Sequence, residues 1–190
     1  MFNEDWYSDT QCIEVRKLVS HVKELKGSII EIGCWEGKST HNIANECYPE
    51  TLICNDNWIG SIAESEVTGQ THITVEICKK RDVYNIFLNN MNKLTNGNYN
   101  VVRRDCIEWL TEYNEPIKFI HIDASHEYES VYKTIKLALP NMVKGGIMCG
   151  DDILTAHINR DDLHGGVERA VRELLPNFKT VENMWYWVNE

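Results

Sequence analysis

The stretch FIHIDASHEYE, Phe119–Glu129, places an acid and a histidine three residues apart at the end of an apolar run. Asp123 and His126 are that pair, and two further acids, Asp151 and Asp152, follow a later apolar run. Neighbouring parallel strands lie about 4.8 Å apart, so carboxylates at their carboxyl ends can converge. Converging carboxylates raise one another's pKa values unless a cation lies among them, and oxygen ligands suit Mg²⁺, Mn²⁺ or Ca²⁺. The pattern therefore predicts a divalent metal site at Asp123, Asp151 and Asp152.

His126 is the predicted general base, because it lies within reach of anything bound to that metal. A neutral imidazole near pH 7 can take a proton from a hydroxyl, and a metal-bound hydroxyl gives its proton up more readily. His121 alternates with Ile120 and Ile122, which predicts a buried structural histidine instead. The simpler alternative is that Asp123 caps the next helix and the acid pair lies in a surface turn.

A second set of candidate residues lies in EIGCWEGKST, Glu31–Thr40. Gly33 and Gly37 allow the backbone to approach a ligand and a helix to begin there. Asp56 lies about 20 residues after the turn, where a carboxylate can accept both hydroxyls of a ribose. The third glycine of a pyrophosphate-binding turn is missing. Together these features predict a ligand with a nucleoside but no diphosphate, although each taken singly also fits an ordinary turn or helix cap.

Alternating strand-like and helix-like segments must position these residues. The expected strands are Ser28–Ile32, Thr51–Asn55, Tyr99–Asp105, Ile117–Asp123 and residues 144–152, and the expected helices are Ile13–Leu25, Lys38–Cys47, Val75–Met91, Ile107–Tyr113, Tyr128–Leu139 and Gly166–Leu175. Such alternation predicts a parallel sheet with helices on both faces. The tail FKTVENMWYWVNE predicts a hairpin that turns at Glu182 and Asn183 and adds an antiparallel strand.

Two long polar connections, Trp58–His72 and Ile153–Gly166, are expected to be substrate-binding loops. In the second loop His157, Arg160 and His164 are candidate substrate contacts, with solvated loop residues as an equally good interpretation. Trp58 is expected either in the core or in the wall of the substrate site.

Composition excludes several classes of protein. With 190 residues and 43% hydrophobic content, the chain is expected to form one domain over residues 1–190. The net charge of −10 argues against binding nucleic acid through phosphate neutralisation. The seven cysteines form no C-x-x-C pair, which indicates reduced thiols and a cytoplasmic protein. No apolar stretch reaches the roughly 18 to 20 residues of a membrane span. The aromatic tail Trp185–Trp187 fits either a core or a homo-oligomer interface.

The motif EIGCWEGKST resembles the first motif of class I S-adenosylmethionine-dependent methyltransferases, E-x-G-x-x-x-G-x-S. The order of elements is similar to the Rossmann-like α/β fold of that family, a mostly parallel seven-stranded sheet whose last strand is antiparallel. The resemblance covers nearly the whole chain and implies S-adenosylmethionine as cofactor. The implied cofactor-binding residues are Glu31, Gly33, Cys34, Gly37, Ser39, Thr40, Asn55, Asp56, Asn57, Trp58, Asp105, Cys106 and Asp123.

The pattern HIDASHEYE followed by GGIMCGDD is similar to metal-dependent sugar O-methyltransferases, including those that modify macrolide deoxysugars and viral or bacterial glycans. DNWIG also resembles the D-x-W-x-G of many members, with Asn57 where Thr is common. The resemblance implies methylation of a hydroxyl on a sugar, such as rhamnose, with Mg²⁺ or Mn²⁺ at the three aspartates and His126 as base and substrate contact. The alternatives are a catechol-type O-methyltransferase, a non-catalytic nucleoside-binding domain, and a nucleotide-dependent oxidoreductase or epimerase, which the missing third glycine disfavours.

Overall fold

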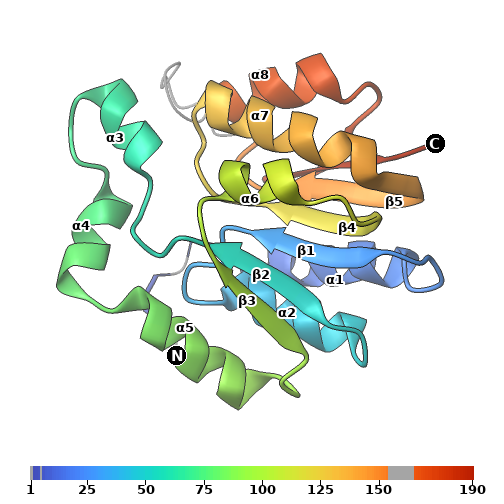
Figure 1. Ribbon diagram of the computed structural model, residues 1–190, viewed down its shortest axis with the longest axis horizontal. Coiled ribbons are helices and arrows are strands. Elements are labelled where there is room, and N and C mark those ends of the chain that lie inside the picture. The colour runs from blue at the N-terminus through green and yellow to red at the C-terminus, as the bar shows by residue number, and fades with distance from the viewer. Residues whose placement is uncertain (1, 5, 154–164) are drawn as a thin grey trace.

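The architecture is that of a computed structural model, which describes residues 2–4, 6–153 and 165–190. In this described part of the chain, seven strands form one sheet in the order β3-β2-β1-β4-β5-β7-β6 (Figure 1). The strands are β1 Ser28–Ile32, β2 Leu52–Asp56, β3 Tyr99–Arg103, β4 Ile117–Ile122, β5 Met142–Gly150, β6 Lys179–Val181 and β7 Met184–Val188. β7 is antiparallel to both of its neighbours, while β1 to β5 pair in parallel. The predicted sheet and its terminal hairpin are confirmed.

Strand register brings the predicted chemistry to one edge of the sheet. Ile122 at the end of β4 pairs with Ile32 of β1 on one side and with Gly150 of β5 on the other. The residues that follow these three, among them Asp123 and Asp151, therefore leave the sheet side by side. The short β-branched runs of β1 and β4 are buried, as expected for central strands covered on both faces.

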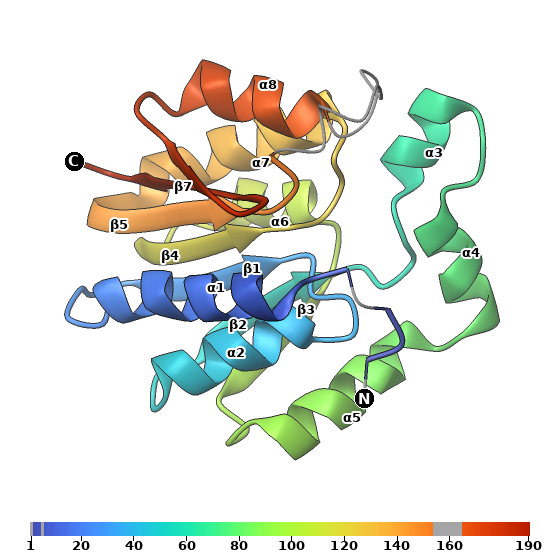
Figure 2. The ribbon, with the colours of Figure 1, turned by 180° about the vertical axis from the view of Figure 1, so that it is seen from behind.

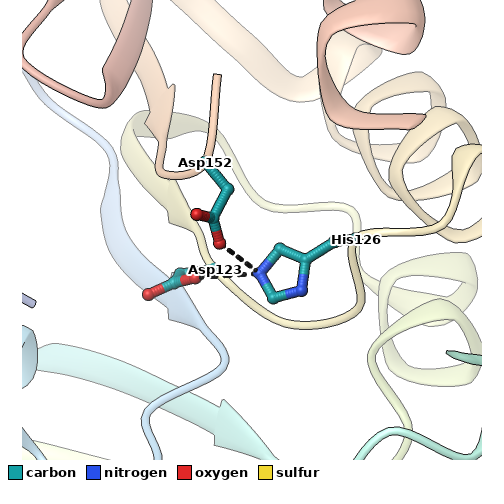
Figure 3. Close-up of side chains that lie close together, drawn as sticks. All are labelled: Asp123, His126 and Asp152. Carbon is teal, nitrogen blue, oxygen red and sulfur yellow. Dashed lines mark ion pairs between the residues drawn. The ribbon is translucent and has the colours of Figure 1, made fainter. Parts of the chain in front are cut away.

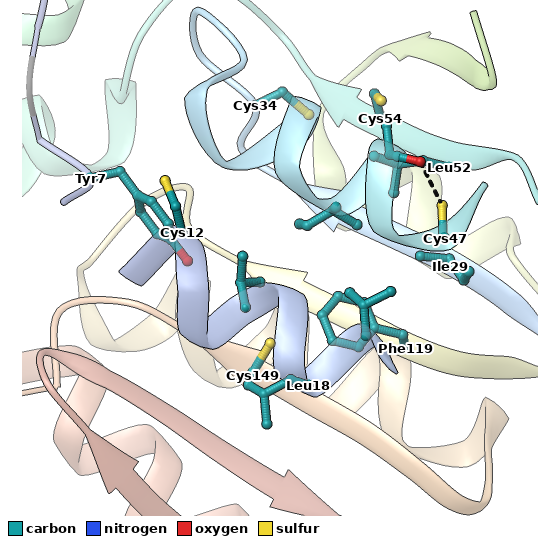
Figure 4. Close-up of a cluster of buried hydrophobic side chains, with 14 of the residues drawn as sticks. Tyr7, Cys12, Leu18, Ile29, Cys34, Cys47, Leu52, Cys54, Phe119 and Cys149 are labelled. Carbon is teal, nitrogen blue, oxygen red and sulfur yellow. Dashed lines mark hydrogen bonds between the residues drawn. The ribbon is translucent and has the colours of Figure 1, made fainter. Parts of the chain in front are cut away.

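Helices cover both faces of the sheet (Figures 1 and 2). On one face lie α1 Asp9–His21, α2 Lys38–Cys47 and α5 Val83–Leu94; on the other lie α6 Cys106–Glu112, α7 Tyr128–Ala138 and α8 Gly165–Leu174, with the 3-10 turn η1 Leu139–Asn141 after α7. Alternate strand residues divide between two cores: Ile29 and Phe119 pack toward α1 and α2 (Figure 4), and Ile30 and Ile120 pack toward α7. No described helix is both long enough and apolar enough to cross a membrane.

The segment between β2 and β3 differs from its prediction. The expected polar loop contains a helix, α3 Ile62–Thr68, and the expected helix over residues 75–91 is divided into α4 Ile73–Lys80 and α5. The helix breaks because Arg81 is extended and the side chain of Asp82 accepts the N–H of Asn85, which starts a new helix. Both α3 and α4 project past the carboxyl edge of the sheet (Figure 1).

The first helix is also displaced from its prediction. It begins at Asp9, where Ser8 and Gln11 form a reciprocal capping box, and it ends at His21 instead of continuing to Leu25.

Candidate active site

The turn between β1 and α2 requires glycine at its first position. Gly33 has a φ of +84°, and a Cβ there would lie 2.0 Å from the carbonyl oxygen of Asp123. The end of β1 therefore touches the end of β4 in a way that no side chain permits. Gly37, with a φ of +91°, is the N-cap of α2 and bonds back to the carbonyl of Cys34.

Asp56 joins this turn to the end of β2. Its Oδ2 accepts the N–H groups of Cys34 at 2.8 Å and Trp35 at 2.9 Å, and its Oδ1 accepts the N–H of Trp58 at 2.7 Å. Burial raises the pKa of Asp56, although these three hydrogen bonds oppose the rise. A carboxylate has about four acceptor positions, so Oδ1 retains one for a hydroxyl of a bound nucleoside.

Asn55 contributes a second acceptor to the same region. Its Nδ2 donates to the carbonyl oxygens of Val102 and Arg104, both at 3.2 Å, while its Oδ1 is buried without a hydrogen-bond partner in the described structure. Buried polar atoms are normally satisfied, so an unpaired acceptor beside the cavity fits the donor groups of a nucleoside. The residues around the turn therefore suit the cofactor that the sequence implies.

Trp58 lies in the core and not in a substrate wall. It is 4% exposed, packs between Tyr84 and Phe87, and donates from Nε1 to the carbonyl oxygen of Trp35 at 2.8 Å. Two residues on, Gly60 has a φ of +84°, and a Cβ there would meet the backbone of α4 at 2.5 Å. The D-x-W-x-G motif thus fixes the path from β2 into α3 and α4.

Three titratable side chains meet at the ends of β4 and β5 (Figure 3). His126 Nε2 lies 2.8 Å from Asp152 Oδ2 and 3.5 Å from Asp123 Oδ1. One ligand atom from each residue lies within 4.8 Å of the other two, a spacing that could hold a metal ion. Asp152 has a left-handed backbone, φ +63°, and its Oδ1 accepts Nδ2 of Asn183 from the β6–β7 turn at 3.0 Å.

One predicted metal ligand, Asp151, is not part of this cluster, which contains His126 instead. Asp151 lies beside the cluster, but its Oδ1 accepts Nε2 of Gln11 from α1 at 2.5 Å. Burial, and then the charges of Asp123 and Asp152, raise the pKa of Asp151. The acid pair is thus divided: Asp152 faces His126, and Asp151 is held by α1.

Glu64 is a site residue that sequence reasoning missed. It is fully buried on α3, and its Oε1 accepts both Nδ1 of His126 at 2.8 Å and the backbone N–H of His126 at 3.1 Å. His72 Nδ1 lies 3.3 Å from the other oxygen. Burial alone would raise the pKa of Glu64, but the hydrogen bond and charge of His126 and the charge of His72 lower it to about 2.

His126 is therefore enclosed by carboxylates. Burial lowers its pKa, but Asp123, Asp152 and Glu64 outweigh that effect and raise the pKa well above the usual value. The only hint of Glu64 in the sequence was an acid in a segment expected to bind substrate.

The site residues surround a cavity of about 780 Å³ beyond the strand ends. The predicted residues that line it are Gly33, Cys34, Ser39, Asn55, Asp56, Asn57, Asp105, Cys106, Asp123, His126, Asp151 and Asp152. Asp105 also caps α6 by accepting the N–H groups of Ile107 and Glu108. The predicted residues His157, Arg160 and His164 lie outside the described residues.

Four predicted cofactor residues, Glu31, Gly37, Thr40 and Trp58, are not among those that line the cavity. Glu31 pairs in register with His121 and points with it toward the α1 face, where the two side chains approach to 3.3 Å with neither exposed. His121 is buried as predicted. Glu31 therefore does not line the cavity, because strand alternation turns its side chain toward the α1 face.

The glycine turn, the acid after β2 and the carboxylates after β4 and β5 therefore lie around one cavity at the carboxyl edge of a Rossmann-like sheet. Residues 30–153 match a family model described as a methyltransferase domain. That match covers more than half of the chain, so the chain belongs to this methyltransferase family. No curated protein sequence matches the chain.

Several solved structures share this fold, and three methyltransferases among them serve as examples. The O-methyltransferase NovP has a TM-score of 0.66 at 16% identity, with 94% of this chain and 79% of that chain covered. The calicheamicin methyltransferase CalS11 has a TM-score of 0.66 at 15% identity, with coverages of 96% and 80%. The O-methyltransferase from Bacillus cereus, in complex with SAH, has a TM-score of 0.64 at 18% identity, with coverages of 95% and 81%. The predicted methyltransferase family and fold are confirmed.

Proposed function

We propose that this chain transfers the methyl group of S-adenosylmethionine to a sugar hydroxyl that has a second hydroxyl beside it. The observation that carries the proposal is the meeting of Asp123, His126 and Asp152 at the edge of a cavity that also contains the glycine turn. CalS11, one of the structures with this fold, is described as a TDP-rhamnose 3'-O-methyltransferase, which supports a sugar acceptor.

The chain's own groups fit a nucleoside cofactor and a divalent cation. Gly33, Asn55 and Asp56 would hold the cofactor, which when bound supplies the methyl carbon as its bond to sulfur breaks and its bond to the acceptor oxygen forms. Asp123 and Asp152 would hold the cation, which when bound makes the acceptor hydroxyl more acidic. Carboxylate oxygens suit Mg²⁺ or Mn²⁺.

His126 accepts the proton of the acceptor hydroxyl at Nε2. Glu64 accepts the hydrogen of Nδ1, which fixes the tautomer and the orientation of the ring. The three enclosing carboxylates raise the pKa of His126 well above its usual value, and a cation held by Asp123 and Asp152 would oppose that effect.

Methyl transfer from labelled S-adenosylmethionine to methyl α-L-rhamnoside, with and without EDTA, tests the function. We expect product only when Mg²⁺ or Mn²⁺ is present. Asp152→Asn should abolish metal-dependent turnover and leave cofactor binding within about threefold. Full activity after thorough chelation would contradict the proposed requirement for a divalent metal ion.

His126→Ala tests the base. We expect kcat to fall by about 10² to 10⁴, as is typical of a general base, with metal affinity largely retained. If metal affinity is lost instead, His126 is a metal ligand and the base assignment is wrong. A catechol acceptor in the same assay tests the alternative substrate class.

A further inference from the structure

Large apolar side chains gather at the mouth of the cavity. Trp6, Ile59, Ile62 and Ile73 line it, and each is between 44% and 57% exposed. Nine large apolar side chains are exposed in the described part of the chain, and these four belong to one place. We call them the apolar rim. Clustered exposed apolar side chains at a cavity mark a binding surface, whereas scattered ones do not.

The rim is held in place by specific contacts. Trp6 packs against Trp35 of the glycine turn with ring centroids 5.4 Å apart and the ring planes tilted by 34°. The segment before Trp6 is fixed by Glu4, whose carboxylate lies 2.6 Å from Arg81. This segment crosses beside the carboxyl edge of the sheet, near the base of α4 (Figure 2).

The rim and the His126 site belong to one cavity. Ile62 and Glu64, both on α3, line it together with His126, to which Glu64 is hydrogen-bonded. At the start of the same helix, Ser61 Oγ lies 3.1 Å from Ser125 Oγ in the segment after β4. A molecule with its hydroxyl at His126 therefore extends along α3 toward the rim.

The cavity is also strongly acidic. Its described lining contains eight carboxylates but only one lysine and one arginine. Several of the eight have cationic or imidazole partners: Glu4 and Glu36 pair with Arg81, and Glu64 pairs with His126 and His72. The arginine, Arg104, makes two bonds to the carboxylate of Glu112 at 2.8 and 3.0 Å, and the lysine, Lys38, lies 3.7 Å from Asp9. A diphosphate would meet repulsion here, because phosphate recognition relies on Arg, Lys or free backbone N–H groups.

We propose that the acceptor is an uncharged glycoside with an apolar aglycone, seated on the apolar rim, and that nucleotide-activated sugars are excluded. The proposal rests on the sugar methyltransferase function proposed above and names its substrate class. It separates this chain from CalS11, which is described as acting on TDP-rhamnose.

Three probes with the same sugar test the proposal: p-nitrophenyl α-L-rhamnoside, methyl α-L-rhamnoside and TDP-L-rhamnose. Each is titrated by calorimetry into the protein saturated with S-adenosylhomocysteine and Mg²⁺, and each is assayed for methyl transfer. We expect the aryl glycoside to bind about tenfold more tightly than the methyl glycoside, because its ring is removed from water on the rim. TDP-L-rhamnose should bind most weakly at low salt. Tighter binding of TDP-L-rhamnose than of the aryl glycoside, or no binding of the aryl glycoside, would overturn the proposal.

Variants show whether the rim itself produces the preference. Ile62→Asn and Ile73→Asn should reduce the ratio of aryl to methyl glycoside affinity toward one, whereas a purely structural defect would weaken both equally. Val67→Asn is the matched control, because Val67 is 54% exposed on α3 but does not line the cavity. An unchanged ratio in both rim variants would overturn the proposal.

Two further outcomes separate this proposal from its alternatives. Preferred binding of the aryl glycoside without methyl transfer would leave the rim assignment standing and refute the proposed reaction. Sedimentation at the same protein concentrations tests for a second copy of the chain on the rim. A dimer that Ile62→Asn dissociates and Val67→Asn does not would overturn the glycoside assignment.

Discussion

Replacing Glu64 by glutamine should weaken both the folded state and the reaction. The change keeps the size of the side chain but removes the charge that faces His126 and His72. The fall in the pKa of Glu64 from 4.5 to about 2 corresponds to about 3 kcal/mol of stability at neutral pH. We therefore expect Glu64→Gln to lose about 3 kcal/mol of unfolding free energy at pH 7, measured by urea denaturation in EDTA.

The pH dependence gives a second measurement of the same effect. The folded-state pKa of Glu64 is lower than its unfolded value, so its stabilisation is complete above about pH 4.5 and is lost as the pH falls toward 2. The difference between wild type and Glu64→Gln should therefore shrink to about 2 kcal/mol at pH 3.5.

The effect of Glu64→Gln on the reaction rate follows from the role of Glu64 in orienting the imidazole ring of His126. Carboxylates that orient a histidine beside a metal typically contribute 10-fold to 100-fold in metal affinity or activity, and we expect kcat/KM to fall by that factor. Glu66→Gln is the matched control, because Glu66 is exposed on the same helix. A Glu64→Gln protein within 1 kcal/mol of wild type and with unchanged kcat/KM would refute the reasoning.

Three other substitutions test single contacts. Gly33→Ala would place a Cβ 2.0 Å from the carbonyl oxygen of Asp123, so it should lower the unfolding free energy by about 3 kcal/mol or prevent folding. Gly69→Ala is the control, because Gly69 has open space around it, and should cost about 1 kcal/mol. Comparable denaturation midpoints for the two variants would contradict this expectation. Lys118→Met should lower the unfolding free energy in urea by about 2 kcal/mol without lowering kcat. The buried ammonium of Lys118 donates to the carbonyl oxygens of Lys23 and Leu25 and to the carboxylate of Glu50, and an unchanged midpoint would count against that network. Asn183→Ala should weaken Mg²⁺ binding in calorimetry about tenfold, because Asn183 donates to Asp152, one of the two proposed metal ligands. Wild-type affinity would exclude this positioning role.

The sequence alone was enough to predict the sheet and the residues at its edge. β-Branched runs separated by amphipathic helices specify a parallel α/β sheet, because each pattern is local and has its own period. The position of Asp123, Asp151 and Asp152 at the ends of such runs then placed all three at one edge, since carboxyl ends of parallel strands coincide there. The glycines of the first turn were recognisable for the same local reason.

Only the tertiary structure decided which side chains complete the site. Glu64 contacts His126, which is 62 residues away in the sequence, and Gln11 contacts Asp151, which is 140 residues away. Neither contact corresponds to a recognisable spacing in the sequence, because contacts between distant elements depend on how α1 and α3 pack on the sheet. Trp58 is a further example. Its motif could be recognised in the sequence, but its burial depends on the packing of α5 against it. Local spacing determines what a residue can do, and packing determines what it faces.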